Sequence, residues 1–384
     1  MSQINANAIL DANGGNTATI NSMTPTAESL QGFRNRIING DMRIDARNAG
    51  ASVSIPDDTT TYTVDRFAIY ENTSGALSAQ QDSSAPTGFN NSLKITVTTA
   101  DASIAANDRA LFRQRIEGFN VADLGFGTAN AKTVTLSFWV RSSLTGTFGG
   151  SLMNGASDRS YPFSYSISVA DTWEQKSVTI AGDTTGTWLT TNGIGLQVNW
   201  SLAAGTDDAG TAGAWVGATK RGVTGQVQVI STLNATWYIT GVQLEVGSVA
   251  TPFERRPFGT ELALCQRYYE TNFPLGTAPA PNINIEPSNV GSISYNGNTT
   301  RTTPCWYKVT KRANPTVTLY SPAGYANSNS NSFNIYISPT WYNYGGTPNS
   351  NNAGFILDGS SSGGSGSTGS AYLTAGNWSA SAEL

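Results

Sequence analysis

Aromatic and amide side chains are concentrated near the C-terminal end of the sequence. The segment 339–352, PTWYNYGGTPNSNN, mixes tryptophan, tyrosine and asparagine with the glycines and prolines that are typical of a loop. Flat aromatic rings can stack on the apolar side of a sugar ring, and amide groups can hydrogen-bond its hydroxyls. A subunit interface uses tyrosine and tryptophan equally readily, so the pattern predicts either role. The candidate residues are Trp341, Tyr342, Asn343 and Tyr344.

The nine tryptophans differ in their local sequence context. Trp139 and Trp237 stand inside apolar, strand-like segments, which predicts that both belong to a hydrophobic core. Trp173, Trp188 and Trp215 lie near threonine, glycine and aspartate residues that favour turns, so an exposed position fits their context. Core packing is still the favoured interpretation for each of these three. We keep Trp188 and Trp215 as further candidate ligand-binding residues.

Groups that could carry catalysis or bind a metal are scarce. The chain contains no histidine, which removes Ser-His-Asp triads, Cys-His nucleophiles and imidazole metal sites. A glycosidase needs two carboxyl groups that face each other, whereas neighbours in a strand point to opposite faces. The adjacent acids Asp57-Asp58 and Asp207-Asp208 are therefore predicted to be turn residues. The sequence predicts no catalytic residue, no metal site and no cofactor, and thus a protein that is not an enzyme.

Composition predicts a protein built from many short strands. Only 12% of the 384 residues are charged, about half of the usual ~25%, and Gly, Ser, Thr and Asn are abundant. The 22 basic residues are scattered and the formal net charge is -4, so no nucleic-acid partner is expected. No apolar run approaches the ~20 residues that span a bilayer, so no membrane insertion is expected either. The N-terminal residues lack the basic and apolar regions of an export signal, which predicts a protein made in the cytosol.

The patterning of the first two thirds of the chain predicts a polar arm and a β-sandwich. Residues 1–33 have isolated apolar positions without a sustained period, so we expect an arm that either is disordered or orders on a partner. Residues 34–257 contain alternating strands separated by turns, without crossover helices, which predicts an antiparallel sandwich. Within it, residues 110–125 predict an edge strand and one short helical turn.

The last third predicts a short helix and a second β domain. Residues 258–272 form the predicted junction, with a helix over about 260–270. Residues 273–384 predict a smaller C-terminal β domain that forms an exposed tip. The Gly/Ser tract 360–370 is followed by one more predicted strand, so we expect it to be a surface loop within this domain.

The two cysteines do not indicate a disulfide framework. Cys265 lies in the predicted helix, where a buried structural thiol is the favoured interpretation. A bridge between Cys265 and Cys305 is the alternative.

Two segments near the ends of the predicted sandwich resemble a known family. NRIINGDMRIDARNAGASVS (35–54), followed by YTVDRF (62–67), resembles the start of a domain that recurs in bacteriophage tail-fibre and appendage proteins, including those of cyanophages. TGVQLEVGSVATPFERRPFGTELALCQRYYE (240–270) is similar to the closing strand and helix of that domain. WSASAEL (378–384) resembles the ending of several phage tail proteins. Segments that match the jelly-roll style of carbohydrate-binding modules lie between these ends, at 135–148, 171–188 and 195–202.

The resemblance implies a structural protein of a bacteriophage virion, a tail fibre or similar appendage, with a jelly roll that resembles sugar-binding modules. It implies a homotrimer whose N-terminal arm attaches to other virion proteins and whose tip recognises a host-surface polysaccharide. The expected location is the virion, assembled in the host cytoplasm. A purely structural head fibre or capsid decoration protein without a ligand is the second hypothesis, and a polysaccharide depolymerase is the third.

Several jelly rolls of the sugar-binding type hold a structural calcium ion between acidic residues near the first and last strands. In this sequence the last predicted strand of the sandwich, ITGVQLE, has Gly241 and Gln243 where neighbouring acids would help, and only Glu245 remains. We therefore predict that metal ions are dispensable for stability.

Overall fold

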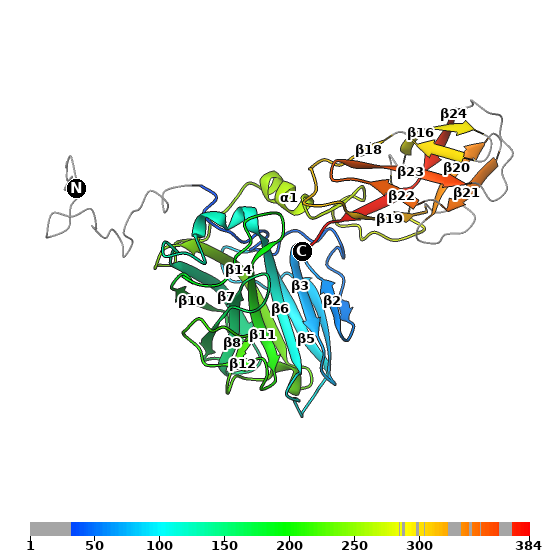
Figure 1. Ribbon diagram of the computed structural model, residues 1–384. Coiled ribbons are helices and arrows are strands. Elements are labelled where there is room, and N and C mark those ends of the chain that lie inside the picture. Colours follow the sequence, from blue (N-terminus) through cyan, green and yellow to red (C-terminus); the bar gives the residue numbers. More distant parts are fainter. Residues whose placement is uncertain are drawn as a thin grey trace, which may run out of the picture.

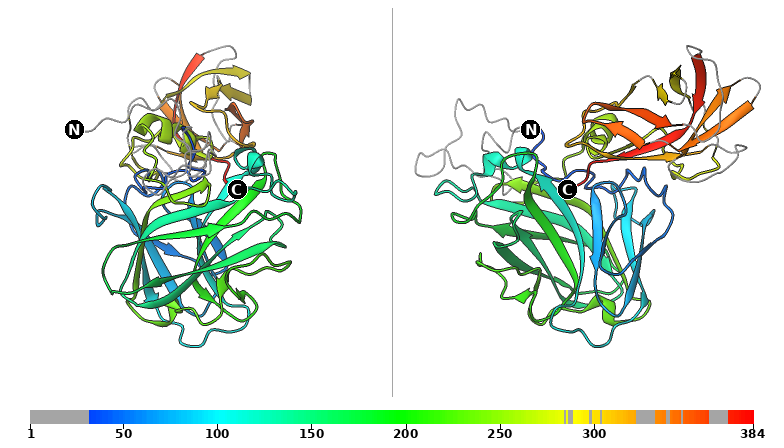
Figure 2. Two further views of the ribbon diagram at one scale, coloured as in Figure 1. Left: turned by 90° about the vertical axis from the view of Figure 1, so that its left-hand side faces the viewer. Right: turned by 45° about the vertical axis from the view of Figure 1, so that its right-hand side comes forward.

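Two six-stranded sheets face each other and form the body of the protein (Figures 1 and 2). The computed structural model describes residues 32–283, 285, 289–296, 299–302, 304–321, 332–337, 340–345, 347–360 and 371–384; it describes only the backbone at 289–302, 332–347, 358–360 and 371–375. The first sheet consists, in spatial order, of β1 Val53–Ile55, β4 Ala76–Asp82, β5 Ser92–Thr99, β14 Thr236–Val246, β7 Val134–Ser142 and β10 Glu174–Ile180. The second consists of β2 Thr59–Tyr62, β3 Phe67–Glu71, β6 Arg109–Glu117, β11 Ile194–Ala204, β8 Gly146–Met153 and β9 Ser160–Ile167.

All neighbouring strands in these two sheets are antiparallel, which confirms the predicted all-β jelly-roll sandwich. Short accessory elements connect the strands: the 3-10 turns η1 Gly118–Asn120, η2 Ala122–Leu124 and η3 Val229–Ser231, and the parallel pair β12 Ala209–Gly210 and β13 Gly222–Val223. The predicted turn positions of the adjacent aspartate pairs are confirmed.

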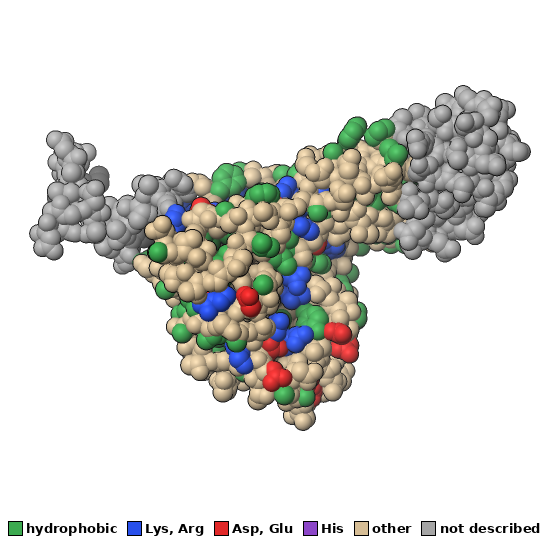
Figure 3. All heavy atoms as spheres, viewed as in Figure 1, with side chains coloured by type: hydrophobic (Ala, Val, Ile, Leu, Met, Phe, Trp, Pro, Cys, Tyr) green, Lys and Arg blue, Asp and Glu red, His purple; other side chains and the backbone are tan. Residues whose placement is uncertain are grey.

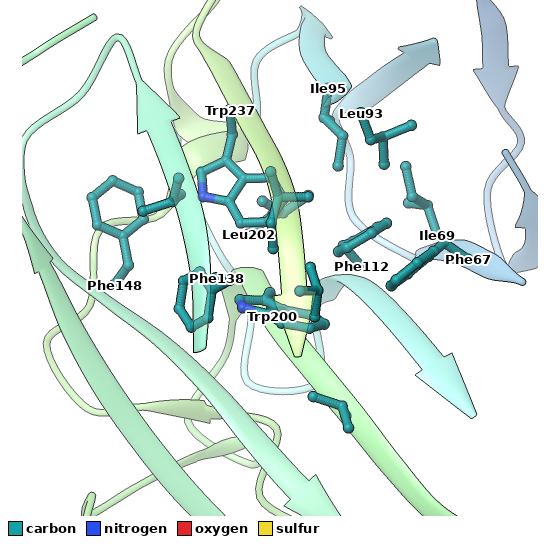
Figure 4. Close-up of a cluster of buried hydrophobic side chains, with 14 of the residues drawn as sticks. Phe67, Ile69, Leu93, Ile95, Phe112, Phe138, Phe148, Trp200, Leu202 and Trp237 are labelled. Atoms are coloured by element: carbon teal, nitrogen blue, oxygen red, sulfur yellow. The ribbon is translucent and has the colours of Figure 1, made fainter. Parts of the chain in front are cut away.

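Large aromatic and aliphatic side chains fill the space between the sheets (Figure 4). Phe112 lies at the centre, with ring centroids 5.5 Å from Trp200 and 5.7 Å from Trp237. Both tryptophans are fully buried, as predicted for Trp237. Trp139 is different: it is half-buried on the outer surface of its sheet, because its neighbours Phe138 and Val140 point inward and side chains alternate along a strand. The prediction of a core position for Trp139 was wrong.

Strand β6 is an interior strand and not an edge strand. It pairs with β3 on one side and with β11 on the other. Its inward positions Ala110, Phe112 and Ile116 belong to the core, whereas the arginines between them face outward. The prediction for 110–125 was wrong about the strand's position, because charged residues at alternate positions suggest an exposed edge even when the sheet continues on both sides.

Buried polar side chains join the beginning of the sandwich to its end. The Asn35 side chain donates to the Val242 carbonyl oxygen at 3.1 Å. The backbone N–H of Asn39 donates to the Glu261 carboxylate at 2.5 Å, and the Arg256 guanidinium donates to the same carboxylate at 3.3 Å. The two segments whose sequences carry the family resemblance therefore lie side by side and form one unit.

The helix of the junction is shorter than predicted. Helix α1, Phe258–Gln266, ends before the tyrosine pair, and β15, Tyr269–Thr271, pairs with the strand β25, Asn377–Ser381. Pairing with a strand more than 100 positions away overrides the local helical pattern. Cys265 is buried beside Tyr268, as predicted, and both cysteines are free thiols, so no bridge joins them.

The C-terminal domain contains two further sheets. The smaller one has the order β15, β25 and β19, the last of which is Thr316–Tyr320. The larger one consists of β18 Cys305–Trp306, β23 Gly354–Ser360, β17 Thr299–Thr302, β16 Asn289–Asn296, β24 Ala371–Ala375, β20 Ser332–Ile337 and β21 Thr340–Gly345, with β22 Thr347–Ser350 paired to β23. Strand β24, predicted beyond the Gly/Ser tract, is confirmed; residues 361–370 of the tract, like residues 1–31 of the predicted arm, lie outside the described residues.

Buried ion pairs connect the sandwich to the C-terminal segment. Arg66 pairs with Glu383, and its guanidinium carbon lies 3.5 Å from the centroid of the Tyr268 ring. Arg267 donates to both oxygens of Glu117, at 2.9 and 2.6 Å.

Within the described part of the chain, α1 is far too short to cross a membrane, and no other helix there could do so.

Candidate functional site

A groove on the C-terminal domain combines an exposed tryptophan with amide side chains. Its volume is about 210 Å³. It is lined by Pro304, Trp306, Asn349, Ser350, Asn351, Gly354, Phe355 and Ile356, none of which is charged. Trp306 is 68% exposed, the largest exposed fraction among the large hydrophobic side chains that the structure describes.

The position of Trp306 follows from the pairing of two short strands. Trp306 lies opposite Gly354 where β18 pairs with β23. A Cβ atom at Gly354 would lie 3.0 Å from the indole ring and 2.6 Å from the Cys305 carbonyl oxygen, so only glycine lets the ring rest against the backbone. The next residue, Tyr307, points into the core, which leaves the indole on the outer face. One side of the ring is thus supported by the strand while the residue stays open to solvent.

Three polar residues flank this ring. Ser350 donates its hydroxyl to the Pro315 carbonyl oxygen at 3.0 Å, which fixes the local backbone. The side-chain oxygen of Asn351 accepts from the amides of Ala353 and Gly354 at 2.8 and 3.1 Å. Its amide nitrogen has no partner among the described residues, and Asn349 and Asn351 are both exposed. The arrangement offers a flat apolar surface beside amide donors, which is the chemistry that a pyranose ring requires.

The predicted residues 341–344 belong to a strand and not to a loop. Strand β21 pairs with β20 in register, with Trp341 opposite Tyr336 and Tyr344 opposite Phe333. The loop prediction was wrong because aromatic residues favour strand pairing, and the glycines and prolines that suggested a loop flank the strand. The side chains of Trp341, Tyr342, Asn343 and Tyr344 lie outside the described part, so their ligand-binding role stays a prediction.

Trp188 and Trp215 are brought together on the sandwich. Their ring centroids are 5.4 Å apart in an edge-to-face arrangement, and both rings contact Phe126. The indole N–H groups donate to the carbonyl oxygens of Thr185 and Ala181, and both side chains are half-buried against the core. The adjoining hollow has a volume of about 20 Å³, enough for a water molecule and not for a sugar ring. This geometry favours packing for both, and their role as ligand-binding residues stays a prediction.

Sequence reasoning missed Trp306. The signal was present in CWYK (305–308), because alternation in a strand places Trp306 on the face opposite Cys305 and Tyr307. What the local sequence does not contain is the glycine at position 354, some 50 positions later, on which the ring rests.

No group of three Asp, Glu or Cys side chains suited to a metal ion occurs in the described residues. Glu245, the only acidic residue of β14, is already engaged. Its carboxylate accepts from the amide and hydroxyl of Thr251 at 2.8 and 2.6 Å, and from Gln243 at 2.8 Å. Arg34 lies 3.5 Å away.

Comparison with known proteins gives fold-level similarities only. No protein-family model and no curated protein matches the chain. Among solved structures, the enzymatically active domain of tailspike protein 4 of bacteriophage CBA120 is similar over 56% of this chain and 22% of its own, with 12% identity and a TM-score of 0.29. A CBM4 module matches 54% of this chain and 98% of its own, with 14% identity and a TM-score of 0.26. The family 11 carbohydrate-binding module of Clostridium thermocellum, solved with a mixed-linked tetrasaccharide, matches 52% and 98%, with 9% identity and a TM-score of 0.27. Likenesses of this extent concern architecture, and no function follows from them.

Proposed function

We propose that the chain is a structural protein of a bacteriophage virion, a tail fibre or similar appendage, which holds a neutral glycan of the host surface in the groove around Trp306. It binds the glycan without cleaving it. The virion role is supported by the sequence resemblance of 35–54 and 240–270, two segments that pack against each other through Asn35, Asn39 and Arg256, the last of which donates to the Ile37 carbonyl oxygen. Residues 341–344 remain a second candidate contact in the same domain.

The observation that carries the glycan role is the exposed indole of Trp306 on the backbone of Gly354. A tryptophan that is 68% exposed contributes little to folding, because most of its apolar surface stays in water. Its rigid support lowers the entropy lost when a sugar stacks on it. The uncharged lining indicates that this groove takes the neutral part of a glycan.

A single site of this kind binds weakly. One covered indole contributes roughly 2 kcal/mol from apolar burial, and hydrogen bonds add little because they replace bonds to water. The affinity of one site is therefore expected near millimolar, about -4 kcal/mol. A homotrimer displayed in several copies on one virion raises the avidity by ~10² or more without a new contact. Light scattering of the full chain tests the trimer, which a stable monomer would contradict.

The first test compares two exposed aromatic side chains. Trp306→Ala should abolish binding of the full chain to host cells and to a glycan array, while its free energy of unfolding changes by less than about 1 kcal/mol. Phe119→Ala is the matched control, because Phe119 is 60% exposed but lies on the sandwich. Equal binding by wild type and Trp306→Ala would exclude this groove.

A head fibre or capsid decoration protein without a ligand is the competing role, and it predicts no glycan binding by any variant. A depolymerase is separated from both by release of reducing ends from host polysaccharide. Labelling of virions with an antibody to this chain distinguishes tail from head.

A further inference from the structure

Four arginines gather on the outer surface of the second sheet, away from the Trp306 groove. We call Arg109, Arg113, Arg115 and Arg221 the arginine face. The first three occupy alternate outward positions of β6, and Arg221 comes from the segment after β12. Figure 3 shows Lys and Arg side chains at the surface in the middle of the sandwich, where Figure 1 places β3 and β6.

Two tyrosines from the neighbouring strands complete this surface. Tyr70, on β3, lies opposite Leu111, between Arg109 and Arg113. Tyr62, on β2, lies opposite Ala68, whose other neighbour is Arg113. The guanidinium carbons of Arg109 and Arg113 lie 5.0 and 5.6 Å from the centroid of the Tyr70 ring. The surface therefore presents planar cations and aromatic rings together.

Within the described residues, few carboxylate side chains balance these positive charges. Asp208 is paired with both Arg109, at 3.3 Å, and Arg221. In the part of the chain that the structure describes, neither Arg113 nor Arg115 has an ion pair with an Asp or Glu side chain. Arg115 donates at 2.7 Å to the backbone oxygen of Leu384, the last residue of the sequence, which also accepts from the Tyr62 hydroxyl at 2.9 Å. The four guanidinium groups therefore outnumber the Asp and Glu carboxylates that pair with them in the described part of the chain, four to one.

Arg113 is the most deeply placed member. It is 8% exposed, and its guanidinium donates to the Thr60 hydroxyl at 2.7 Å, whereas its Nε has no hydrogen-bond partner among the described residues. Burial, together with the nearby Arg115, lowers the pKa of Arg113 to about 10. Burying an uncompensated cation opposes folding, and residues that oppose folding persist where a ligand uses them.

We propose that the arginine face binds the carboxylate or sulfate groups of an acidic polysaccharide. The fork of a guanidinium matches either oxyanion with two parallel hydrogen bonds. Tyr62 and Tyr70 supply the aromatic surface for the sugar rings that carry these groups. This site is separate from the Trp306 groove, so an experiment can contradict either proposal without affecting the other.

The surroundings favour an acidic polysaccharide over nucleic acid. Tyr70 donates its hydroxyl to Asp58 at 2.5 Å, and the exposed Asp207 lies in the same turn as Asp208. A nucleic acid carries a phosphate at every nucleotide and needs a track of cations, which these rim carboxylates interrupt. A glycan with charges on some of its sugars fits a short cationic surface.

The test uses the full chain and four polymers. Affinity electrophoresis with polygalacturonate, dextran sulfate, neutral dextran and double-stranded DNA measures binding at two salt concentrations. We expect retardation by one or both acidic polysaccharides, weakened by salt, and none by neutral dextran. The stronger of the two identifies carboxylate or sulfate as the ligand group. Arg113→Met and Arg115→Gln should each weaken this binding at least tenfold.

The matched control is Arg141→Gln, because Arg141 also lies over a tyrosine, 5.0 Å from the Tyr238 ring centroid, but on the opposite sheet. The proposal would be overturned if Arg141→Gln weakened polysaccharide binding as much as Arg113→Met and Arg115→Gln do. Tighter binding of DNA than of either polysaccharide would also overturn it. A second measurement separates binding from folding: Arg113→Met should melt at the wild-type temperature or above. A fall of several degrees would show that Arg113 is structural and would also overturn the proposal.

Discussion

The joint between the sandwich and the C-terminal domain and the arginine face both contain buried cationic side chains, but they surround them differently. At the joint, Arg66 faces Glu383, Arg267 faces Glu117, and Lys311 faces Glu270 at 2.5 Å. On the arginine face, Arg113 donates to the Thr60 hydroxyl, and Arg115 donates to the backbone oxygen of Leu384, the last residue of the sequence.

The difference separates structure from recognition. A buried ion pair with further hydrogen bonds holds two segments in one geometry, and removal of either partner leaves the other charge buried and unpaired. A buried guanidinium without a carboxylate keeps its strongest interaction for a ligand. The joint is therefore expected to matter for stability and the arginine face for binding, which the following predictions test.

The largest effect is expected at the joint. Lys311→Met leaves the buried Glu270 carboxylate without its cation and should lower the free energy of unfolding by about 3 to 5 kcal/mol. The double variant Lys311→Met/Glu270→Met should recover most of this loss, because it removes both charges. Chemical denaturation measures both. Lys176→Met is the control, since the Lys176–Glu174 pair is partly exposed and should contribute less than about 1 kcal/mol. A loss as small in Lys311→Met as in the control would contradict the structural role of the joint.

A smaller effect is expected from Asp65, a buried carboxylate that the joint does not fully compensate. One of its oxygens accepts from the Ala46 amide at 3.2 Å, and the other has no partner among the described residues. Burial raises the pKa of Asp65 from 3.8 to about 7, with Arg47 opposing the rise. A raised pKa means that the folded state holds its proton more tightly, so this contribution to stability is lost as the pH rises from about 4 to about 7.

Asp65→Asn removes the pH dependence of stability that the Asp65 carboxyl causes. It should raise the free energy of unfolding at pH 8 by roughly 1 to 3 kcal/mol. Asp183→Asn is the control of opposite sign. Burial raises the pKa of Asp183, but its hydrogen bonds with Arg159 and Thr185 together outweigh burial and hold the pKa below 3.8. Its contribution is present above that pH and is lost on acidification, so Asp183→Asn should be destabilising at pH 8. Denaturation at pH 4 and pH 8 measures the pH dependence from Asp65, and denaturation at about pH 2.5 and pH 8 measures that from Asp183, whose contribution is lost below 3.8. The two should have opposite signs, and equal signs would refute the assignment.

The smallest effect, none, is expected from removal of metal ions. Glu245 is satisfied by Thr251, Gln243 and Arg34, so protein groups and not a cation stabilise it. EDTA should leave the melting temperature unchanged. A fall of several degrees that calcium reverses would show that a metal ion contributes where the structure shows protein groups.

The alternating pattern of the sequence was sufficient to predict the sandwich, its strands without crossover helices and the core position of Trp237. These features follow from local chemistry, because β-branched and aromatic residues at every second position bury one face of a strand. The same alternation rule gave wrong predictions for Trp139 and for β6. It predicts that successive side chains point to opposite faces of a strand, but not which of the two faces is buried.

The sequence by itself thus determined the β class, the turn positions of Asp57-Asp58 and Asp207-Asp208, and the absence of histidine chemistry. Only the tertiary structure decided that Trp306 rests on Gly354, and that Arg113 is buried without a carboxylate partner among the described residues. Both depend on pairing partners far away in the sequence. A strand pattern alternates between two faces, whereas burial and charge compensation on each face are set by whichever distant segment folds against it.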